Sequence, residues 1–287
     1  MFADKSSSFK SLLRVSGLLL CMLPGACSTS FTYNQLDWLI PWYMGSYVDL
    51  NSEQKELLKI RLDPLLSWHR EEELAGYIEF LDRIEMDLKE PVAPETVRSW
   101  MSEVRQAVDR IEFRLLQLSL EMGESMNNEQ IADFKTSLMD KQQEYRDEYL
   151  KRNDKDYTED NYKRLSKNLR RFSGKLNKEQ KQTLQRAAES MRRFDIPWLE
   201  DRELWLENIK ELLDRKPGWQ QAIVDSYRQR DENRSKEYQM TLEHNIQVLS
   251  ESISEILSNL DDKQRSRFIK KIGKYKSSIE QLAKKET

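Results

Sequence analysis

Apolar residues recur every three or four positions along most of the chain, which is the period of an amphipathic helix. The clearest run covers residues 95–122, where the apolar positions are Val97, Trp100, Met101, Val104, Val108, Ile111, Leu115, Leu118 and Met122. Strand-like alternation between turns is absent, and the 287 residues contain only 8 glycines and 7 prolines. The pattern therefore predicts an all-α protein, an elongated bundle of about eight or nine amphipathic helices.

Breaks in this pattern divide the chain into smaller units. Pro64 lies inside the apolar run that starts at Asn51, so we expect a kink or break there. The last third predicts a long helical hairpin, with one arm over 238–260 and the other over 268–282. The charged stretch 151–160 is the best candidate for a hinge. We therefore predict one helical sub-bundle over 51–155 and a second over 156–287 that ends in the hairpin.

The first 26 residues have the pattern of an export signal and are set aside from the fold prediction. Lys5, Lys10 and Arg14 precede an apolar run over 15–23, which is much shorter than the roughly 20 residues that span a bilayer. The following Leu-Pro-Gly-Ala-Cys sequence resembles the signal of bacterial lipoproteins, in which the cysteine thiol receives a diacylglycerol before cleavage. That resemblance makes Cys27 the lipidated residue, although Pro24 stands where leucine is usual. An ordinary signal peptide cut nearby, or a retained N-terminal anchor, are the alternatives.

The number and positions of the cysteines are consistent with export and lipidation. Only Cys21 and Cys27 exist, and removal of the leader leaves Cys27 as the sole thiol, so no internal disulfide is expected. Acyl chains such as palmitate would then tether the protein to a lipid bilayer. Ser28 follows the cysteine, and by resemblance to the sorting rule of enteric-type bacteria this indicates an outer-membrane lipoprotein that faces the periplasm, with the inner membrane less favoured.

The composition excludes two classes of protein. The net charge is −3, and 34% of the residues are charged, with both signs well mixed. This argues against nucleic acid as a partner, because nucleic-acid binders carry a basic stripe of one sign. The 27 aromatic residues argue against disorder. A basic cluster over 163–175 is expected to be a solvated helix face, or otherwise a contact for anionic lipid or an acidic partner.

Aromatic residues crowd the predicted tether, residues 27–50. They are Phe31, Tyr33, Trp38, Trp42, Tyr43 and Tyr47. Tryptophan and tyrosine favour membrane interfaces, so one interpretation is a collar on the bilayer. The alternatives are a segment that packs into the bundle and a site for a protein partner.

This region also carries a family resemblance. The sequence Tyr-Asn-Gln-Leu-Asp-Trp-Leu-Ile-Pro-Trp-Tyr over 33–43, followed by Leu-Leu-Ser-Trp-His-Arg over 65–70, resembles an uncharacterised family of gammaproteobacterial lipoproteins with a domain of unknown function. The resemblance covers about residues 27–80. It implies the localisation of a lipoprotein and a helical fold, but no catalytic activity. Within it, Trp68, His69 and Arg70 are predicted to form a polar anchor.

One short pattern occurs four times, each time an apolar residue, then Asn or Asp, two further residues and Gln. The four copies have their Asx residue at Asn51, Asn127, Asn177 and Asp261. The pattern predicts a capping box, in which the Asx side chain accepts a backbone N–H and the Gln reaches back to the cap. It also resembles the L-T-x-x-Q motif of Spy-like periplasmic chaperones, although Thr is replaced and the spacings of 76, 50 and 84 residues are unequal.

The sequence offers few candidates for catalytic or metal-binding residues. The chain has only two histidines, His69 and His244, and His69 lies near Glu72 and Glu73 without a third strong ligand nearby. We therefore predict no metal, no cofactor and no catalytic residue. The preferred function is a membrane-anchored module, facing the periplasm, that binds an envelope protein or acts as a chaperone. The alternative is a helical hydrolase or metal-dependent enzyme that uses His69 with nearby carboxylates.

Overall fold

The computed structural model describes residue 33 and residues 35–284, and in this part of the chain all regular structure is helical, which confirms the all-α class. Its elements are α3 (Leu36–Met44), α4 (Ser52–Trp68), the π-helix η1 (His69–Glu73), α5 (Leu74–Asp87), α6 (Pro94–Ser125), α7 (Asn128–Tyr149), α8 (Asp154–Ser173), α9 (Lys178–Ser190), α10 (Asp195–Leu212), α11 (Trp219–Arg228), α12 (Lys236–Ser258) and α13 (Asp262–Ala283). None of these helices combines the length and the apolar character that crossing a bilayer requires.

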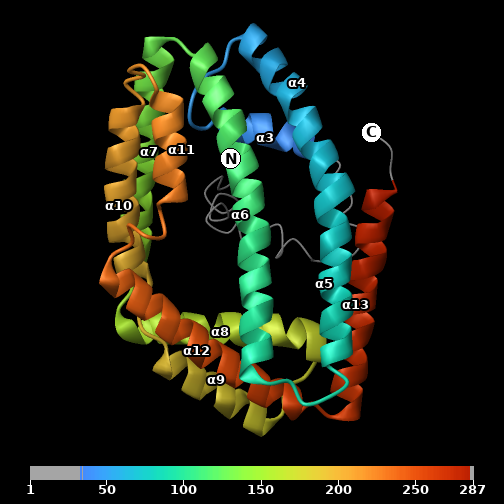
Figure 1. Cartoon of the computed structure of the whole chain (residues 1–287). Helices are drawn as coiled ribbons and strands as arrows, with labels where there is room; N and C mark the ends of the chain where they lie inside the picture. The colour runs from blue at the N-terminus through green and yellow to red at the C-terminus, as the bar shows by residue number, and fades with distance from the viewer. Residues whose placement is uncertain (1–32, 34, 285–287) are drawn as a thin grey trace, which may run out of the picture.

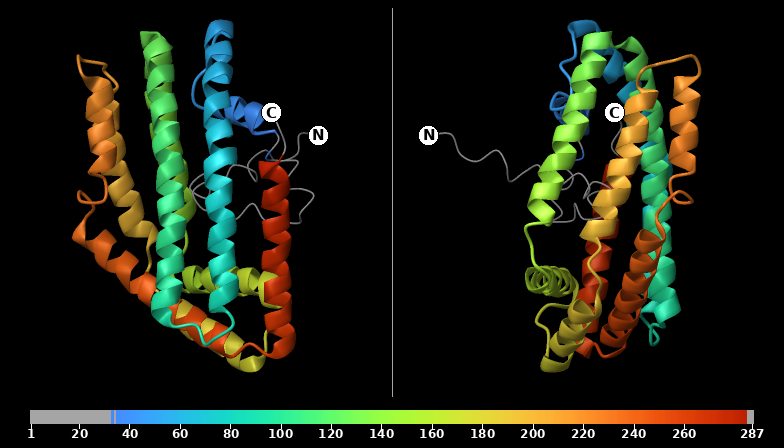
Figure 2. Two further views of the ribbon diagram at one scale, coloured as in Figure 1. Left: turned by 45° about the vertical axis from the view of Figure 1, so that its right-hand side comes forward. Right: turned by 90° about the vertical axis from the view of Figure 1, so that its left-hand side faces the viewer.

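The helices outline an open frame (Figure 1). α4, α5 and α13 form one side, α7, α10 and α11 form the other, and α8, α9 and α12 cross one end, while α6 runs between the two sides. The further views show α3 and α8 on the same side of this frame (Figure 2). The frame is the form that the predicted multi-helix arrangement takes.

The predicted break at Pro64 is not present. α4 continues through Pro64 to Trp68, and the chain then forms the π-helix η1 before α5 begins. Pro64 lacks an N–H and cannot donate to the carbonyl of Ile60, but the helix tolerates that single missing bond. The irregularity appears five residues later, as a widened turn.

The two long helices of the predicted C-terminal hairpin mainly contact other neighbours. α12 packs against α6 and α9, whereas α13 packs against α5 and α8. Their heptad-like apolar faces are buried as expected, with Ile272 and Tyr275 of α13 less than 5% exposed. The periodicity identified the buried faces, but both faces are covered by helices distant in sequence. The division of the chain near residue 155 stays a prediction, and α8 begins within the proposed hinge, where the Asn153 side chain caps it.

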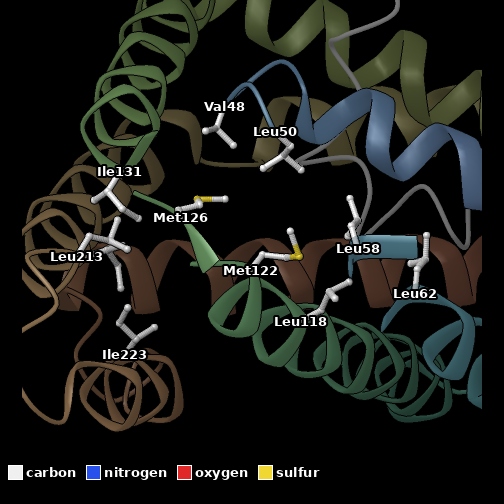
Figure 3. Close-up of a cluster of buried hydrophobic side chains, with 11 residues drawn as sticks. Val48, Leu50, Leu58, Leu62, Leu118, Met122, Met126, Ile131, Leu213 and Ile223 are labelled. Atoms are coloured by element: carbon white, nitrogen blue, oxygen red, sulfur yellow. The ribbon is translucent and has the colours of Figure 1, made fainter. Parts of the chain in front are cut away.

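Two main apolar clusters hold the frame together. One lies where the start of α4, the end of α6, the start of α7 and helices α10 and α11 meet (Figure 3). The other lies at the opposite end, where α5, α6, α9, α12 and α13 meet. Leu58 and Met122 in the first cluster and Ile256 in the second are at most 1% exposed. Each cluster lies beside a pair of the capped helix starts that the sequence predicts.

Candidate functional site

The aromatic residues of the tether do not act as one group. Trp38 and Trp42, one turn apart on α3, stack with ring centroids 6.2 Å apart and are 59% and 56% exposed. Tyr43 and Tyr47 form a hydrogen bond of 2.7 Å between their hydroxyls, and Tyr47 packs on Phe134 of α7. These two tyrosines therefore join α3 to the bundle, while the tryptophans face outward. Cys27 and Phe31 lie outside the described residues.

Tyr33 is buried, 9% exposed, and contacts the π-helix. Its hydroxyl lies 2.9 Å from Nδ1 of His69, and the hydroxyl of Tyr77 lies 3.4 Å from Nε2 on the other edge of the ring. Tyr33 also packs with Leu74 of α5 and with Ile279 and Leu282 of α13. The first described residue is therefore fixed between the middle of one long helix and the end of the last helix.

His69 is at the centre of a chain of polar contacts. Glu73 is 5% exposed and accepts two hydrogen bonds from the Arg110 guanidinium, of 2.6 and 2.9 Å. Each ring nitrogen of His69 has a tyrosine hydroxyl as its partner, Tyr33 at Nδ1 and Tyr77 at Nε2.

Burial keeps the His69 ring neutral. The loss of hydration lowers the pKa of His69 to about 4, and the Glu73 carboxylate opposes this only in part. Burial also raises the pKa of Tyr77 above its usual value. Both ring nitrogens of His69 are engaged by tyrosine hydroxyls, and in the described part of the chain no three His, Cys, Asp or Glu side chains gather as metal ligands would.

The predicted polar anchor is therefore more than the Trp-His-Arg triplet. Trp68 donates from Nε1 to Glu72 (3.0 Å) and its ring lies under the Arg114 guanidinium at 4.7 Å, on the exposed side of the π-helix. Arg70 lies 5.8 Å from the centre of the Tyr33 ring. Sequence reasoning placed Glu72 and Glu73 near His69 without distinguishing them, and it missed the participants Tyr77 and Arg110. The run of three glutamates beside His69 offered no way to select the buried one.

All four predicted capping boxes are present. In each, the Asx side chain accepts from the backbone N–H three residues on, and the Gln side chain accepts from the backbone N–H of the cap, at the starts of α4, α7, α9 and α13. The cap bonds are 2.7–3.2 Å long. The Gln side chain of each box therefore has its Oε1 at the cap while its Nε2 points away from its own helix.

That free end joins the caps in two reciprocal pairs. Nε2 of Gln54 lies 2.9 Å from Oε1 of Gln130, and Nε2 of Gln130 lies 2.7 Å from Oε1 of Gln54. Gln180 and Gln264 repeat the arrangement at 2.8 and 2.9 Å. Each Nε2 also donates to a backbone carbonyl five residues before the partner Gln, and the four acceptors are Ser125, Asp49, Asn259 and Lys175. The two pairs therefore use the same set of bonds.

This correspondence extends to the helices around each pair. α7 and α13, which begin at the second box of each pair, both have 22 residues. The contact between α4 and α6 corresponds to the contact between α9 and α12. In the same way, the contact of α7 with α10 corresponds to the contact of α13 with α5. Residues from α4 to α7 and from α9 to α13 thus repeat one plan, in which the second capped helix of each half packs on the other half. The motif spacings of 76, 50 and 84 residues already indicate this repeat, because a short interval separates two long ones of similar length.

The surface of the described residues has open hollows at two places that bear on function. One lies beside the Gln180 cap and is lined by Thr183, Arg186 and Glu255, which bond to one another. The other runs along α13 beside Lys270, Lys271 and Lys274. Neither contains the His69 network.

Comparison with known proteins gives a family but no function. Neither the curated proteins nor the solved structures include a significant match to this chain. A family model, described as a family of unknown function (DUF6279), matches residues 46–239. The match includes the Trp-His-Arg segment, the π-helix and three of the four capping boxes, and it starts after the aromatic signature over 33–43. Since the matched region is more than half of the chain, the protein belongs to this uncharacterised family.

Proposed function

We propose that this protein is a lipid-anchored helical module that faces the periplasm from the outer membrane and binds other proteins, with no catalytic activity of its own. The observation that carries the proposal is the pairing of the four Asx–Gln caps into two reciprocal glutamine pairs. The caps resemble the L-T-x-x-Q motif of Spy-like periplasmic chaperones, and here they join long amphipathic helices into an open frame (Figure 1). A frame of this kind presents extended helix faces to a partner.

The arrangement of His69 favours the binding module over the enzyme alternative. A general base or metal ligand needs a free nitrogen lone pair directed at a substrate or ion. Nδ1 and Nε2 of His69 lie 2.9 and 3.4 Å from the hydroxyls of Tyr33 and Tyr77, and the residue is 5% exposed. The contacts of His69 with Tyr33 and Tyr77 hold Tyr33 in place, which supports a structural role.

The lipid anchor rests on the leader pattern and on Cys27, and the exposed pair Trp38 and Trp42 supports it. Cys27 precedes Trp38 by 11 residues, so the two stacked indoles would lie near any bilayer that holds the acyl chains. Exposed tryptophans near a bilayer are stabilised at the membrane–water interface, because the indole ring is apolar and its N–H is polar.

Two measurements test the proposal. Cells are labelled with a radioactive or clickable palmitate, and wild type is compared with Cys27→Ala; we expect label and outer-membrane fractionation only in wild type. The purified protein is then mixed with reduced, aggregating α-lactalbumin, and light scattering is followed. We expect both forms to suppress aggregation at near-stoichiometric ratios, because the frame does not include Cys27.

The outcomes separate the two parts of the proposal. Equal palmitate label in Cys27→Ala would overturn the anchor. Light scattering unchanged by either form, at a tenfold molar excess, would overturn the chaperone-like binding activity. A serum albumin control at equal mass concentration corrects for non-specific crowding.

A further inference from the structure

Two segments of this acidic chain are strongly basic. Residues 161–178, in α8, the following loop and the first residue of α9, contain seven lysines and arginines and no acidic residue. Residues 263–279, in α13, also contain seven lysines and arginines and no acidic residue. The whole chain has a net charge of −3, so the remainder must carry a large excess of acids. Positive charge is therefore segregated onto these two segments.

The two basic segments lie against each other. The Phe172 ring of α8 packs on Phe268 and Tyr275 of α13, with centroids 4.9 and 5.7 Å apart. Gly174, which ends α8 with a φ of +83°, is covered by the Arg267 side chain. The Nε2 of Gln264 donates to the Lys175 carbonyl (2.9 Å). Helices almost 100 residues apart in sequence thus form one basic surface, which we call the α8–α13 surface.

The cations of this surface are exposed, and none of them forms an ion pair with an acidic side chain among the residues that the structure describes. Its exposed members are Lys167, Arg170, Arg171 and Lys175 on the α8 side and Arg267, Lys270 and Lys274 on α13. Within the two segments, the ion pairs found among the described residues involve other cations, namely Lys163 with Glu159 and Lys276 with Asp82 and Glu85. Like charges at this density repel one another. An anionic partner would relieve that repulsion.

The α13 side of this surface is hollowed. An open groove of about 690 Å³ is lined by Lys270, Lys271 and Lys274 together with Ile269, Tyr275 and the Glu85 carboxylate. The Lys271 ammonium lies over the Tyr275 ring at 4.8 Å, so it is held at the groove. Basic groups above apolar and aromatic carbon suit a phosphate headgroup that is attached to a glycerol backbone.

The position of the tether favours a membrane as the source of that phosphate. Tyr33 packs on Ile279 and Leu282 of α13, and Cys27 precedes it by six residues, which span at most about 20 Å when extended. Lys274 is five residues from Ile279, a rise of about 8 Å along the helix. The views in Figure 2 place α3 and α8 on the same side of the frame. A bilayer that holds Cys27 would therefore lie within reach of the basic surface.

We infer that the α8–α13 surface docks the protein onto anionic phospholipid headgroups, as a second membrane contact beside the acyl chains and on the side that carries α3. The inference deepens the proposed lipid anchoring and rests on it for orientation. Stable anchoring commonly combines an acyl chain with a polybasic patch, since each lysine or arginine near an anionic surface adds its own attraction. The surface would fix how the frame stands on the membrane.

Vesicle binding without the acyl chains tests this directly. The Cys27→Ala protein, expressed from residue 27 onward so that it carries neither the leader nor acyl chains, is mixed with phosphatidylcholine vesicles containing either no phosphatidylglycerol or 30 mol% of it, and the bound fraction is measured by sedimentation. We expect binding only to the anionic vesicles. This binding should be lost as the NaCl concentration rises from 0.05 to 0.5 M, because the Debye length then shrinks to a few ångströms. Because the test uses neither palmitate label nor an aggregating client, its failure would leave the proposed function standing.

Two quadruple variants made in the Cys27→Ala background make the test specific. In the first, Arg170, Arg171, Lys270 and Lys274 are changed to Gln; we expect the vesicle partition coefficient to fall at least about tenfold. In the matched control, the exposed lysines Lys59, Lys210, Lys216 and Lys236 are changed to Gln, and the coefficient should fall less than about threefold. Equal losses in the two variants, or binding to an acidic peptide but not to the anionic vesicles, would overturn the inference. Unchanged circular dichroism confirms that both variants are folded.

Discussion

The side chains of Gln180 and Gln264, 84 residues apart, hydrogen-bond to each other through both their amide groups while each also caps its own helix. Both residues are at most 5% exposed, so neither amide can replace its partner with bulk water. A capping residue usually serves one helix end. Here the cap also fixes the start of α9 against the start of α13, which makes a local signal into a tertiary contact.

Loss of one member should therefore cost more than a cap. We expect Gln180→Ala to lower the free energy of unfolding by about 2–3 kcal/mol, because it removes a cap bond and both hydrogen bonds between the two buried amides. The measurement is denaturant unfolding followed by circular dichroism. Gln182→Ala, at an exposed position two residues further along α9, is the control and should change stability by less than about 0.5 kcal/mol.

A double-mutant cycle tests the pairing itself. If the reciprocal bonds exist, Gln180→Ala combined with Gln264→Ala should cost at least about 1 kcal/mol less than the sum of the single changes, since the second change removes a group that is already unpaired. Strictly additive costs would mean that the two amides do not interact. The Gln54–Gln130 pair should show a smaller coupling, because Gln130 is only half-buried.

The sequence predicted local structure far better than assembly. The capping boxes depend on residues three positions apart, so all four could be identified from the chain alone. The partner of each Gln is 76 or 84 residues away, and no local pattern states which cap meets which. The same reason explains why α13 was assigned to α12 as a hairpin when its apolar face is covered by α5 and α8. At the His69 site the sequence marked the histidine, but burial alone distinguishes Glu73 from the adjacent Glu71 and Glu72.

Gly174 provides a test of the close contact between α8 and α13. Its φ of +83° is unfavourable for any residue with a Cβ, and a Cβ there would collide with the Arg267 guanidinium. We expect Gly174→Ala to destabilise the protein by about 2 kcal/mol or more, as measured by thermal or denaturant unfolding. Gly76→Ala is the matched control: it lies in the exposed interior of α5 with open space around it, so it should raise stability by up to about 1 kcal/mol. Equal effects of the two changes would contradict the contact.

The hydroxyl of Tyr33 should determine how firmly the tether is held. Tyr33→Phe keeps the ring but removes the hydroxyl that bonds to Nδ1 of His69, leaving a buried ring nitrogen unpaired at a cost of about 1–3 kcal/mol. We expect faster cleavage by a non-specific protease close to residue 33, with the rest of the frame resistant. Tyr162→Phe, at a half-buried ring with no hydroxyl bond among the described residues, serves as control and should leave the cleavage rate unchanged. Identical cleavage of both variants would show that the Tyr33–His69 bond does not hold the segment.

The neutral, buried His69 also predicts a pH dependence of stability. Its pKa in the folded protein is about 4, below the usual 6.5, so between these values the unfolded chain binds a proton that the folded protein does not. The free energy of unfolding therefore rises with pH across this window. The contribution is complete above pH 6.5, is lost as the pH falls toward 4, and amounts to about 3 kcal/mol in total.

Carboxylates titrate in part of the same window, so the prediction is a difference between proteins. Wild type, His69→Gln and His244→Gln are unfolded in denaturant at several values between pH 4 and pH 8. We expect wild type and His244→Gln to share the same slope of stability against pH, and His69→Gln to be less stable at pH 8 but to have a clearly smaller slope between pH 4.5 and 6.5. A slope that is the same in all three would mean that His69 takes up its proton without disturbing the fold, and that the contacts with Tyr33 and Tyr77 do not keep the ring neutral.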